Sequence, residues 1–279
     1  MCGIFGMVRV SDHAYVTTAA LVEATQIVRH RGPDDEGYLL WSRRDIPRLY
    51  AGSETAPRSA AVHGLSRMAP NDKWDVALGH RRLSIVDLSP GGYQPMIHGA
   101  SGLAVAFNGE IYNHIELRRE LEHLGHRFTS RSDTEVLLCA WLEWGDSSLQ
   151  RLNGMFAFLL IDPRNETVYA VRDRFGVKPL YWTRAGGVIA FASEIKQLRT
   201  LPGFPSGVNV AAARDYLATG QIDHDARTLD EGVSQLLGGE RAVVRLNAAV
   251  PAGMDTNSSH GKDDSGDPTR NGSVMVCES

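Results

Sequence analysis

The second residue of the chain is a cysteine that directly follows Met1, in the stretch "MCGIFGMVRV". Once Met1 is removed, Cys2 carries both a thiol and a free α-amine, and such an amine has a pKa of about 7.7–8.0. Nucleophile and base would then belong to one residue. The alternative is that Cys2 begins a buried strand as a small apolar side chain, as most unpaired cysteines do. The opening residues leave both interpretations open.

Composition limits the class of protein. The 279 residues, 43% of them hydrophobic, suffice for one large or two small domains. A net charge of −4 argues against a nucleic-acid surface, which needs a clustered excess of Lys and Arg. The three cysteines, at positions 2, 139 and 277, are too few and too scattered for a disulfide framework, which favours a reducing compartment. With no signal peptide or membrane span predicted, we expect a cytoplasmic protein without nucleic-acid or membrane partners.

Several helices and strands can be placed from the pattern of the sequence. A strand follows Cys2, a helix is predicted over 17–32, and the polar segment 41–77 is predicted as a long surface excursion. Two further helices are expected over 113–125 and 132–145, the second starting with a Ser132-x-x-Glu135 capping box. Cys139 lies inside that helix and is predicted to be a core residue.

The middle of the chain predicts two β-hairpins, over 154–173 and 179–193. The strand 155–161 is apolar on both alternating faces, which is typical of a strand covered by layers on both sides. Strands in the middle with helices outside indicate an α/β protein with a four-layer αββα sandwich. From Leu217 to Ser279 there is no Phe, Trp or Tyr, and we predict that 247–279 is a disordered tail.

Eight stretches carry a resemblance to a known family. They are, in chain order, "MCGIFG", "RHRGPDD", "GHRRLSIVDLSPGGYQPM", "FNGEIYN", "SDTEVLL", "LNGMFAFLLID", "RDRFGVKPLYW" and "FASEIKQL". In this order they resemble the N-terminal glutaminase domain of glutamine-hydrolysing asparagine synthetase. That domain is a class II glutamine amidotransferase with the N-terminal nucleophile (Ntn) hydrolase fold. The resemblance spans residues 2 to about 198.

The resemblance implies a role for each matching residue. Cys2 would attack the side-chain carboxamide of glutamine and form a thioester, its own α-amine moving the proton. Asn108 and Gly109 would form the oxyanion hole, although "NG" alone is equally typical of a turn. Gly3 would allow close backbone approach beside the nucleophile.

Substrate recognition follows from the same resemblance. Arg82 would bind the α-carboxylate of glutamine, because a planar guanidinium suits a bidentate carboxylate contact. The neighbouring Arg81 is interpreted as a surface residue pointing to the opposite face of the strand. Glu110 and Asp133 would bind the α-ammonium, and Asp133 has the alternative role of a first-turn helix acid. Backbone groups of Leu83, Ser84, Ile85 and Val86 would complete the substrate site.

The segment 87–96 resembles the family's loop that closes over glutamine, with Gly91 and Gly92 as hinges. The other interpretation is a plain Pro/Gly surface turn. No metal site is predicted, because His123-x-x-His126 straddles the helix-ending Gly125 without companion ligands.

The domain prediction has three parts: an amidotransferase domain over 2–205, the start of a missing synthetase domain over 206–246, and the tail over 247–279. The family's pyrophosphatase loop, Ser-Gly-Gly-x-Asp-Ser, does not occur in the sequence. No cofactor is therefore expected for this chain, and ATP and magnesium would belong to the missing ligase half. L-glutamine is the expected substrate, and a separate ATP-dependent synthetase subunit or a homodimer mate is the expected partner.

Three hypotheses about function remain. The first is an active glutaminase that supplies ammonia for asparagine biosynthesis or the amidation of a related acceptor. The second is a catalytically silent module that binds glutamine. The third is an N-terminal nucleophile amidase for another amide, against which the pairing of Arg82 with Glu110 and Asp133 argues.

Overall fold

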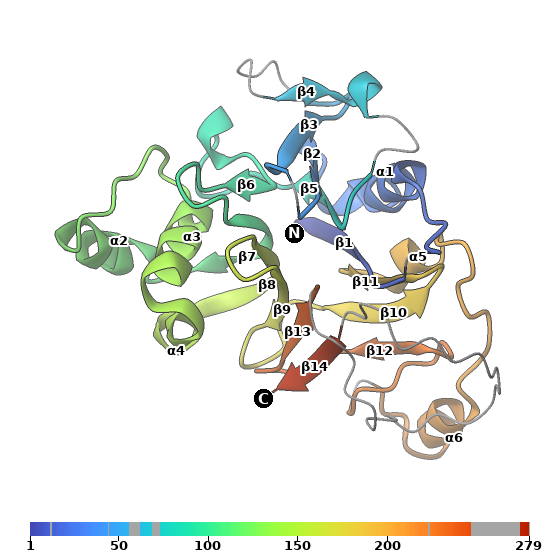
Figure 1. Cartoon of the computed structure of the whole chain (residues 1–279). Helices are drawn as coiled ribbons and strands as arrows, with labels where there is room; N and C mark the ends of the chain where they lie inside the picture. The colour runs from blue at the N-terminus through green and yellow to red at the C-terminus, as the bar shows by residue number, and fades with distance from the viewer. Residues whose placement is uncertain are drawn as a thin grey trace.

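Two β-sheets pack face to face in the centre of the molecule (Figure 1). The computed structural model describes residues 1–11, 13–43, 45–55, 62–68, 73–222, 224–246 and 274–278. The larger sheet has the order β12-β10-β11-β1-β5-β2-β3-β4. Its strands are β1 (Gly3–Arg9), β2 (Asp35–Trp41), β3 (Arg48–Ala51), β4 (His63–Gly64), β5 (Val76–Arg82), β10 (Tyr181–Ala185), β11 (Val188–Ala192) and β12 (Val233–Gln235).

The smaller sheet has the order β14-β13-β9-β8-β7-β6. Its strands are β6 (Met96–Ile97), β7 (Ala104–Ile111), β8 (Gly154–Asp162), β9 (Thr167–Arg172), β13 (Arg241–Arg245) and β14 (Val274–Glu278). Both predicted hairpins are confirmed, as β8 with β9 and β10 with β11. One apolar cluster, including Ile4, Leu78, Leu159 and Phe191, fills the space between the two sheets.

Helices cover the outer face of each sheet and complete the predicted αββα sandwich. On the larger sheet lie α1 (Thr18–Gln26) and α5 (Ile195–Leu198). On the smaller sheet lie α2 (His114–His123), α3 (Asp133–Trp144) and α4 (Ser148–Arg151), and a second core cluster fills the space between these helices and the sheet. Cys139 of α3 is fully buried in that cluster, so the prediction of a core cysteine is confirmed.

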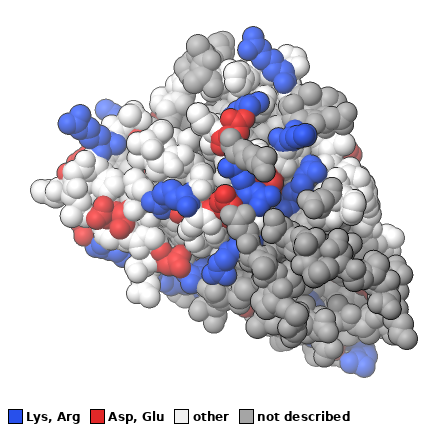
Figure 2. Space-filling model, viewed as in Figure 1, with Lys and Arg blue, Asp and Glu red and all other residues white. Residues whose placement is uncertain are grey.

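Four single-turn 3₁₀ helices and one further α-helix complete the described elements. They are η1 (Arg29–Arg31), η2 (Leu65–Arg67), η3 (Pro90–Gly92), η4 (Gly145–Ser147) and α6 (Val210–Thr219). None of the helices in the described part of the chain has the length and apolar character needed to cross a bilayer. On the described part of the face in Figure 2, Lys and Arg side chains are interspersed with Asp and Glu.

The predicted helix over 17–32 is too long. Helix α1 ends at Gln26, and Val28 leaves the helical region with φ −104° and ψ 24°. The fully buried Val28 packs against Gly3, where a Cβ would lie 2.8 Å from Val28 Cγ2. Gly3 therefore leaves room for the Val28 side chain, which follows the end of α1 and precedes the Arg29–Arg31 turn.

The prediction that 41–77 is a surface excursion is wrong for much of the segment. Strands β3 and β4 extend the larger sheet. Tyr50, Met68 and Trp74 are buried in the apolar cluster beneath α1. Sequence analysis failed here because the polar residues and prolines outnumber the few large side chains that enter the core.

The C-terminal part of the chain also contributes to both sheets. Within 206–246, predicted as the start of another domain, β12 extends the larger sheet and β13 pairs with β9. Within the predicted disordered tail, 274–278 form strand β14 beside β13. Residues 247–273 lie outside the described residues.

The start of α3 is only partly the expected capping box. The Ser132 hydroxyl accepts a hydrogen bond from the Thr134 N–H at 3.1 Å, as predicted. The Glu135 carboxylate does not accept the hydrogen bond from the Ser132 N–H that a capping box requires; that N–H donates to the Ser130 hydroxyl. The Glu135 carboxylate instead accepts hydrogen bonds from the backbone and hydroxyls of Thr129 and Ser130, at 2.7–2.9 Å. Glu135 thereby ties the preceding turn to the helix.

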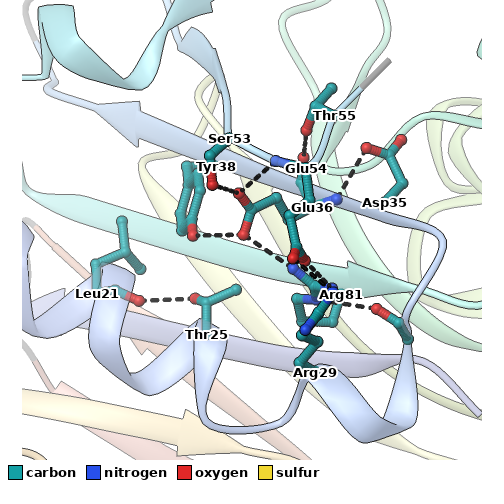
Figure 3. Close-up of polar contacts among 11 residues, drawn as sticks. Leu21, Thr25, Arg29, Asp35, Glu36, Tyr38, Ser53, Glu54, Thr55 and Arg81 are labelled. Carbon is teal, nitrogen blue, oxygen red and sulfur yellow. Dashed lines mark hydrogen bonds and ion pairs between the residues drawn. The ribbon is translucent and has the colours of Figure 1, made fainter.

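Arg81 is not the predicted surface residue. It does point to the face opposite Arg82, but that face is covered, and the Arg81 side chain is 1% exposed (Figure 3). Its guanidinium donates to Glu36, to Glu54 and to the carbonyl of Gly32, each at 2.9 Å. Arg29 also pairs with Glu54, at 2.7 Å. This ion cluster joins β5, β2, the β3–β4 segment and the η1 turn.

Because Glu36 and Arg81 are both buried, removing one partner is expected to be costly. We predict that Glu36→Gln lowers the free energy of unfolding by about 3 kcal/mol, since a buried guanidinium loses the more deeply buried of its two counter-charges. The control is Glu120→Gln, in the exposed Glu120–Arg151 pair, where the change is expected to stay below about 1 kcal/mol. Urea unfolding of both variants measures the difference, and equal stability would contradict a structural role for the cluster.

Candidate functional site

A cavity of about 260 Å³ opens where the ends of several strands meet. Its lining comes from residues around Cys2, the end of β5 with its following loop, β7, and the start of α3. Of the predicted site residues it contains Cys2, Arg82, Leu83, Ile85, Val86, Asn108, Gly109, Glu110 and Asp133. Ser84 is the one predicted residue that does not line it. Segments more than 100 residues apart in sequence thus converge at one place.

Cys2 lies beside the chain segment that follows β5. Its Sγ accepts a hydrogen bond from the Leu83 N–H at 3.4 Å and donates to the Leu83 carbonyl at 3.6 Å. Burial raises the pKa of the Cys2 thiol, while the Leu83 hydrogen bond, the N-terminal amine and Arg82 act in the opposite direction. In this structure that amine belongs to Met1, which also lines the cavity, and burial lowers its pKa.

The backbone of Cys2 is held by Arg31. The Arg31 Nε donates to the Cys2 carbonyl at 2.9 Å, and Nη1 pairs with Glu194 at 3.0 Å. Glu194 also accepts from His30 and from Lys196, each at 2.9 Å. Burial alone would raise the pKa of Glu194, but these partners lower it to about 2. Glu194 therefore carries its charge throughout the neutral range and holds Arg31 in place against the Cys2 carbonyl.

Arg82 is buried beneath the loop that follows it. Its guanidinium donates to the carbonyls of Asp87 and Ser89, and Gly92 packs so closely that a Cβ would collide with it. The Asp87 carboxylate in turn accepts from the N–H groups of Ser89 and Arg131. An arginine has five N–H donors, so Arg82 keeps donors for a ligand in the cavity. Whether the 87–96 loop moves stays a prediction.

Asn108 is the most unusual polar residue of the cavity. It is 1% exposed, and neither its side-chain oxygen nor its nitrogen has a partner among the described residues. Leaving a buried amide unpaired costs roughly 1–3 kcal/mol, so the arrangement indicates a ligand that completes its hydrogen bonds. Gly109 follows directly, and a Cβ there would lie 2.6 Å from Phe156 Cβ.

The two acids of the site lie on different elements. Asp133 begins α3 and accepts a hydrogen bond from the Ile111 N–H at 3.1 Å. Burial raises the pKa of Asp133, and that hydrogen bond opposes the increase. Glu110, near the end of β7, is partly exposed in the same cavity. Asp133 thus lies in the first turn of α3 and also lines the cavity.

Gln94 and Lys178 are among the polar residues of the cavity that were not predicted from the sequence. Gln94 is buried and bridges two elements, since its side chain accepts from the Phe107 N–H at 2.6 Å and donates to the Thr134 hydroxyl at 3.3 Å. Lys178, from the loop between β9 and β10, also lines the cavity. Both lie inside quoted motifs, "GGYQPM" and "RDRFGVKPLYW", but nothing in the local pattern pointed their side chains inward. Among the described residues no group of three or more His, Cys, Asp or Glu is arranged to hold a metal.

The fold and this cavity define a class of protein. A family model described as a glutamine amidotransferase domain matches residues 66–252, which is more than half of the chain. The chain belongs to this family of glutamine amidotransferase domains. The resemblance to a class II amidotransferase domain is thereby confirmed.

Individual relatives narrow the comparison. "Asparagine synthetase [glutamine-hydrolyzing] 1" of Bacillus subtilis (strain 168) is 33% identical over 254 residues, which cover 90% of this chain and 34% of the relative. A "Putative asparagine synthetase [glutamine-hydrolyzing]" of Mycobacterium tuberculosis (strain ATCC 25618 / H37Rv) is 34% identical over 265 residues, covering 90% and 36%. The chain spans about a third of the length of these curated relatives.

A solved structure supports the fold. The glutamine phosphoribosylpyrophosphate (PRPP) amidotransferase from B. subtilis, complexed with ADP and GMP, superposes with a TM-score of 0.57 at 20% identity. The match covers 87% of this chain and 47% of that chain. The predicted Ntn-type αββα sandwich is confirmed.

The Glu194 ion cluster predicts a defined pH dependence. The pKa of Glu194 is lowered from 4.5 to about 2 on folding, so its stabilising charge is complete above pH 4.5 and is lost as the pH falls toward 2. We expect Glu194→Gln to be about 1 kcal/mol less stable than the parent at pH 7, after allowance for solvent screening. Urea unfolding at pH 7, 4 and 3 should show this difference shrinking with acidity. A constant difference would assign the effect to packing rather than charge.

Proposed function

We propose that this domain hydrolyses L-glutamine to glutamate and ammonia through a thioester on Cys2. One observation carries the proposal: a single cavity contains a cysteine nucleophile, a buried unpaired amide, an arginine and two carboxylates. This set matches each part of glutamine, namely the side-chain amide, the α-carboxylate and the α-ammonium. Family membership and the names of the relatives support the same substrate.

Recognition of the amino-acid head group uses residues of both charges in the cavity. Arg82 donates its remaining N–H groups to the α-carboxylate of glutamine. Asp133 and Glu110 accept hydrogen bonds from the α-ammonium. Burial raises the pKa of Asp133 because it destabilises the charged carboxylate. A bound ammonium beside Asp133 offsets that cost.

The first half-reaction forms the thioester. The Cys2 sulfur attacks the carboxamide carbon, and the thiol proton passes through the α-amine of Cys2, once Met1 is removed, to the departing nitrogen. The C–N bond breaks and ammonia leaves. The Asn108 side-chain N–H donates to the oxyanion that develops on the carbonyl, together with the backbone of Gly109.

The second half-reaction regenerates the thiol. The α-amine takes a proton from water as the oxygen attacks the thioester carbon. The C–S bond then breaks, the amine returns its proton to the departing sulfur, and glutamate is released. The relatives' names support a further step in which the ammonia amidates aspartate, or a related acceptor, on a synthetase that uses ATP and magnesium. Either another part of a longer protein or a separate subunit would provide that synthetase.

Replacing the nucleophile gives the primary test. Cys2→Ala is expected to abolish glutamate release, because no other thiol lines the cavity among the described residues. The matched control is Cys139→Ala, since burial raises the pKa of that thiol to about 11 and places it in the core. Intact mass with a glutamine-analogue electrophile should show loss of Met1 and one adduct on Cys2 in the parent protein.

The outcomes separate the competing hypotheses. Unchanged hydrolysis in Cys2→Ala would reject the thioester mechanism. Calorimetric binding of glutamine without glutamate release from the parent protein would favour the silent binding module. Hydrolysis of amides that lack the amino-acid head group would favour a different amidase.

Substitutions of Asn108 and of Arg82 should affect different kinetic constants. Asn108→Ala is expected to lower kcat about 10²–10³-fold with little change in KM, because the oxyanion exists only along the reaction path. Arg82→Met is expected mainly to raise KM, because the α-carboxylate is bound equally before and during reaction. Steady-state glutamate release measures both constants. If Asn108→Ala changed only KM, the oxyanion role would be wrong.

A further inference from the structure

The loop between β9 and β10 is built by hydrogen bonds rather than by apolar packing. The Asp173 carboxylate, 1% exposed, accepts from the N–H groups of Phe156, Phe175, Val177 and Lys178 at 2.9–3.2 Å. Arg172 donates to the carbonyls of Gly176 and Lys178, at 2.7 and 2.8 Å. The Phe175 side chain at the tip is 88% exposed and contributes nothing to the core. The backbone of Lys178 is thus fixed at both its N–H and its carbonyl.

Lys178 uses this rigid backbone to place an ammonium in the cavity. The residue is only 5% exposed, yet it lines the same cavity as Cys2 and Met1. Its ammonium makes no hydrogen bond or ion pair with any side chain of the described residues. The carboxylate nearest in sequence, Asp173, is occupied by the four backbone N–H groups. A buried lysine without a counter-ion is rare, because burial penalises its charge.

The charges around the cavity come from every element that packs there. Burial lowers the pKa of Lys178, Arg31 lowers it further, and Cys2, Asp173 and Glu110 oppose the decrease. Lys178 and Arg31 in turn lower the pKa of the N-terminal amine. The remaining charged groups that face the site are Asp34, Arg82, Asp87 and Asp133. Cys2 and Lys178 thus line one cavity, and the interaction between them is among those that oppose the decrease in the pKa of Lys178.

We propose that Lys178 is a further functional residue of this site, whose ammonium supplies the positive charge that favours the thiolate form of Cys2. The role deepens the proposed function and rests on it. An opposite charge within a few ångströms stabilises an ionised group, and burial in a cavity reduces the screening of that charge by water. Burial makes the Cys2 thiol less acidic, and the N-terminal amine and Arg82 oppose this effect. The Lys178 ammonium, fixed in the same cavity, adds a third positive charge that acts in the same direction.

The test measures the reactivity of the Cys2 thiol, which does not require turnover of glutamine. The rate of alkylation by iodoacetamide is followed from pH 6 to 10 on the full chain, with peptide mapping to separate Cys2 from the other cysteines. The variants are Lys178→Met and Lys178→Gln, which remove the charge, and Lys178→Arg, which keeps it. Lys73→Met, an exposed lysine that lines a different cavity, is the matched control.

Removal of the charge is expected to move the midpoint of Cys2 alkylation upward by about one pH unit, with about tenfold slower alkylation at pH 7. Lys178→Arg and Lys73→Met should stay close to the parent protein. An unchanged midpoint in both neutral variants overturns the proposal. A raised KM for glutamine with an unchanged midpoint also overturns it and assigns Lys178 to substrate binding.

Two further outcomes are informative. If both neutral variants lose cooperative unfolding, Lys178 is a structural residue and the proposal is wrong. A shifted midpoint in a chain that releases no glutamate would keep the role of Lys178 and reject the proposed function. An unshifted midpoint with normal glutamate release would reject the role of Lys178 and keep the proposed function.

Discussion

The geometry of the site depends on the hydrogen bond from the Arg31 Nε to the Cys2 carbonyl. The first residues of a chain fray unless something ties them down, and Cys2 precedes the first residue of β1. Strand β1 is paired on both sides, with β5 and β11, but this pairing begins only after Cys2. The hydrogen bonds of Cys2 with Arg31 and Leu83 fix the position of one further residue, Cys2 itself. That residue is the one whose sulfur enters the cavity.

Arg31 is itself held from two sides. Glu194 fixes its guanidinium from the β11–α5 junction, and the adjacent Gly32 carbonyl is held by the buried Arg81. Arg81 is in turn bound by Glu36 of β2 and by Glu54 from the segment after β3. A continuous series of polar contacts therefore runs from the β3–β4 region to the nucleophile. The segment 41–77 thus supports the turn that positions Cys2, although none of its described residues lines the cavity.

Sequence reasoning succeeded where a residue's role depends on local pattern or on a family motif. The two hairpins, the buried Cys139 and the grouping of Cys2 with Asn108 and Asp133 all follow from such patterns. It failed for Arg81, because period-two alternation says which face a side chain points to but not whether that face is covered. Lys178 was missed for a similar reason. Its direction is set by the hydrogen bonds of Asp173 and Arg172, which no periodicity reveals.

The cavity combines groups that are each unfavourable in a protein interior: an unpaired amide, a carboxylate with a raised pKa and a lysine without a counter-ion. Such costs persist only where the surrounding structure enforces them. Here the enforcement is visible, since Asn108 lies on a strand paired along its length with β8, and Asp133 is fixed between β7 and α3. In the proposed function, a zwitterionic amino acid with a side-chain amide would give Asn108 and Asp133 their partners, and the ionised Cys2 thiol would give Lys178 one. The unpaired groups destabilise the empty site, and binding of the proposed substrate next to the Cys2 thiol would remove that cost. A purely structural pocket would keep the cost without any return, which is the physical argument for a glutamine site.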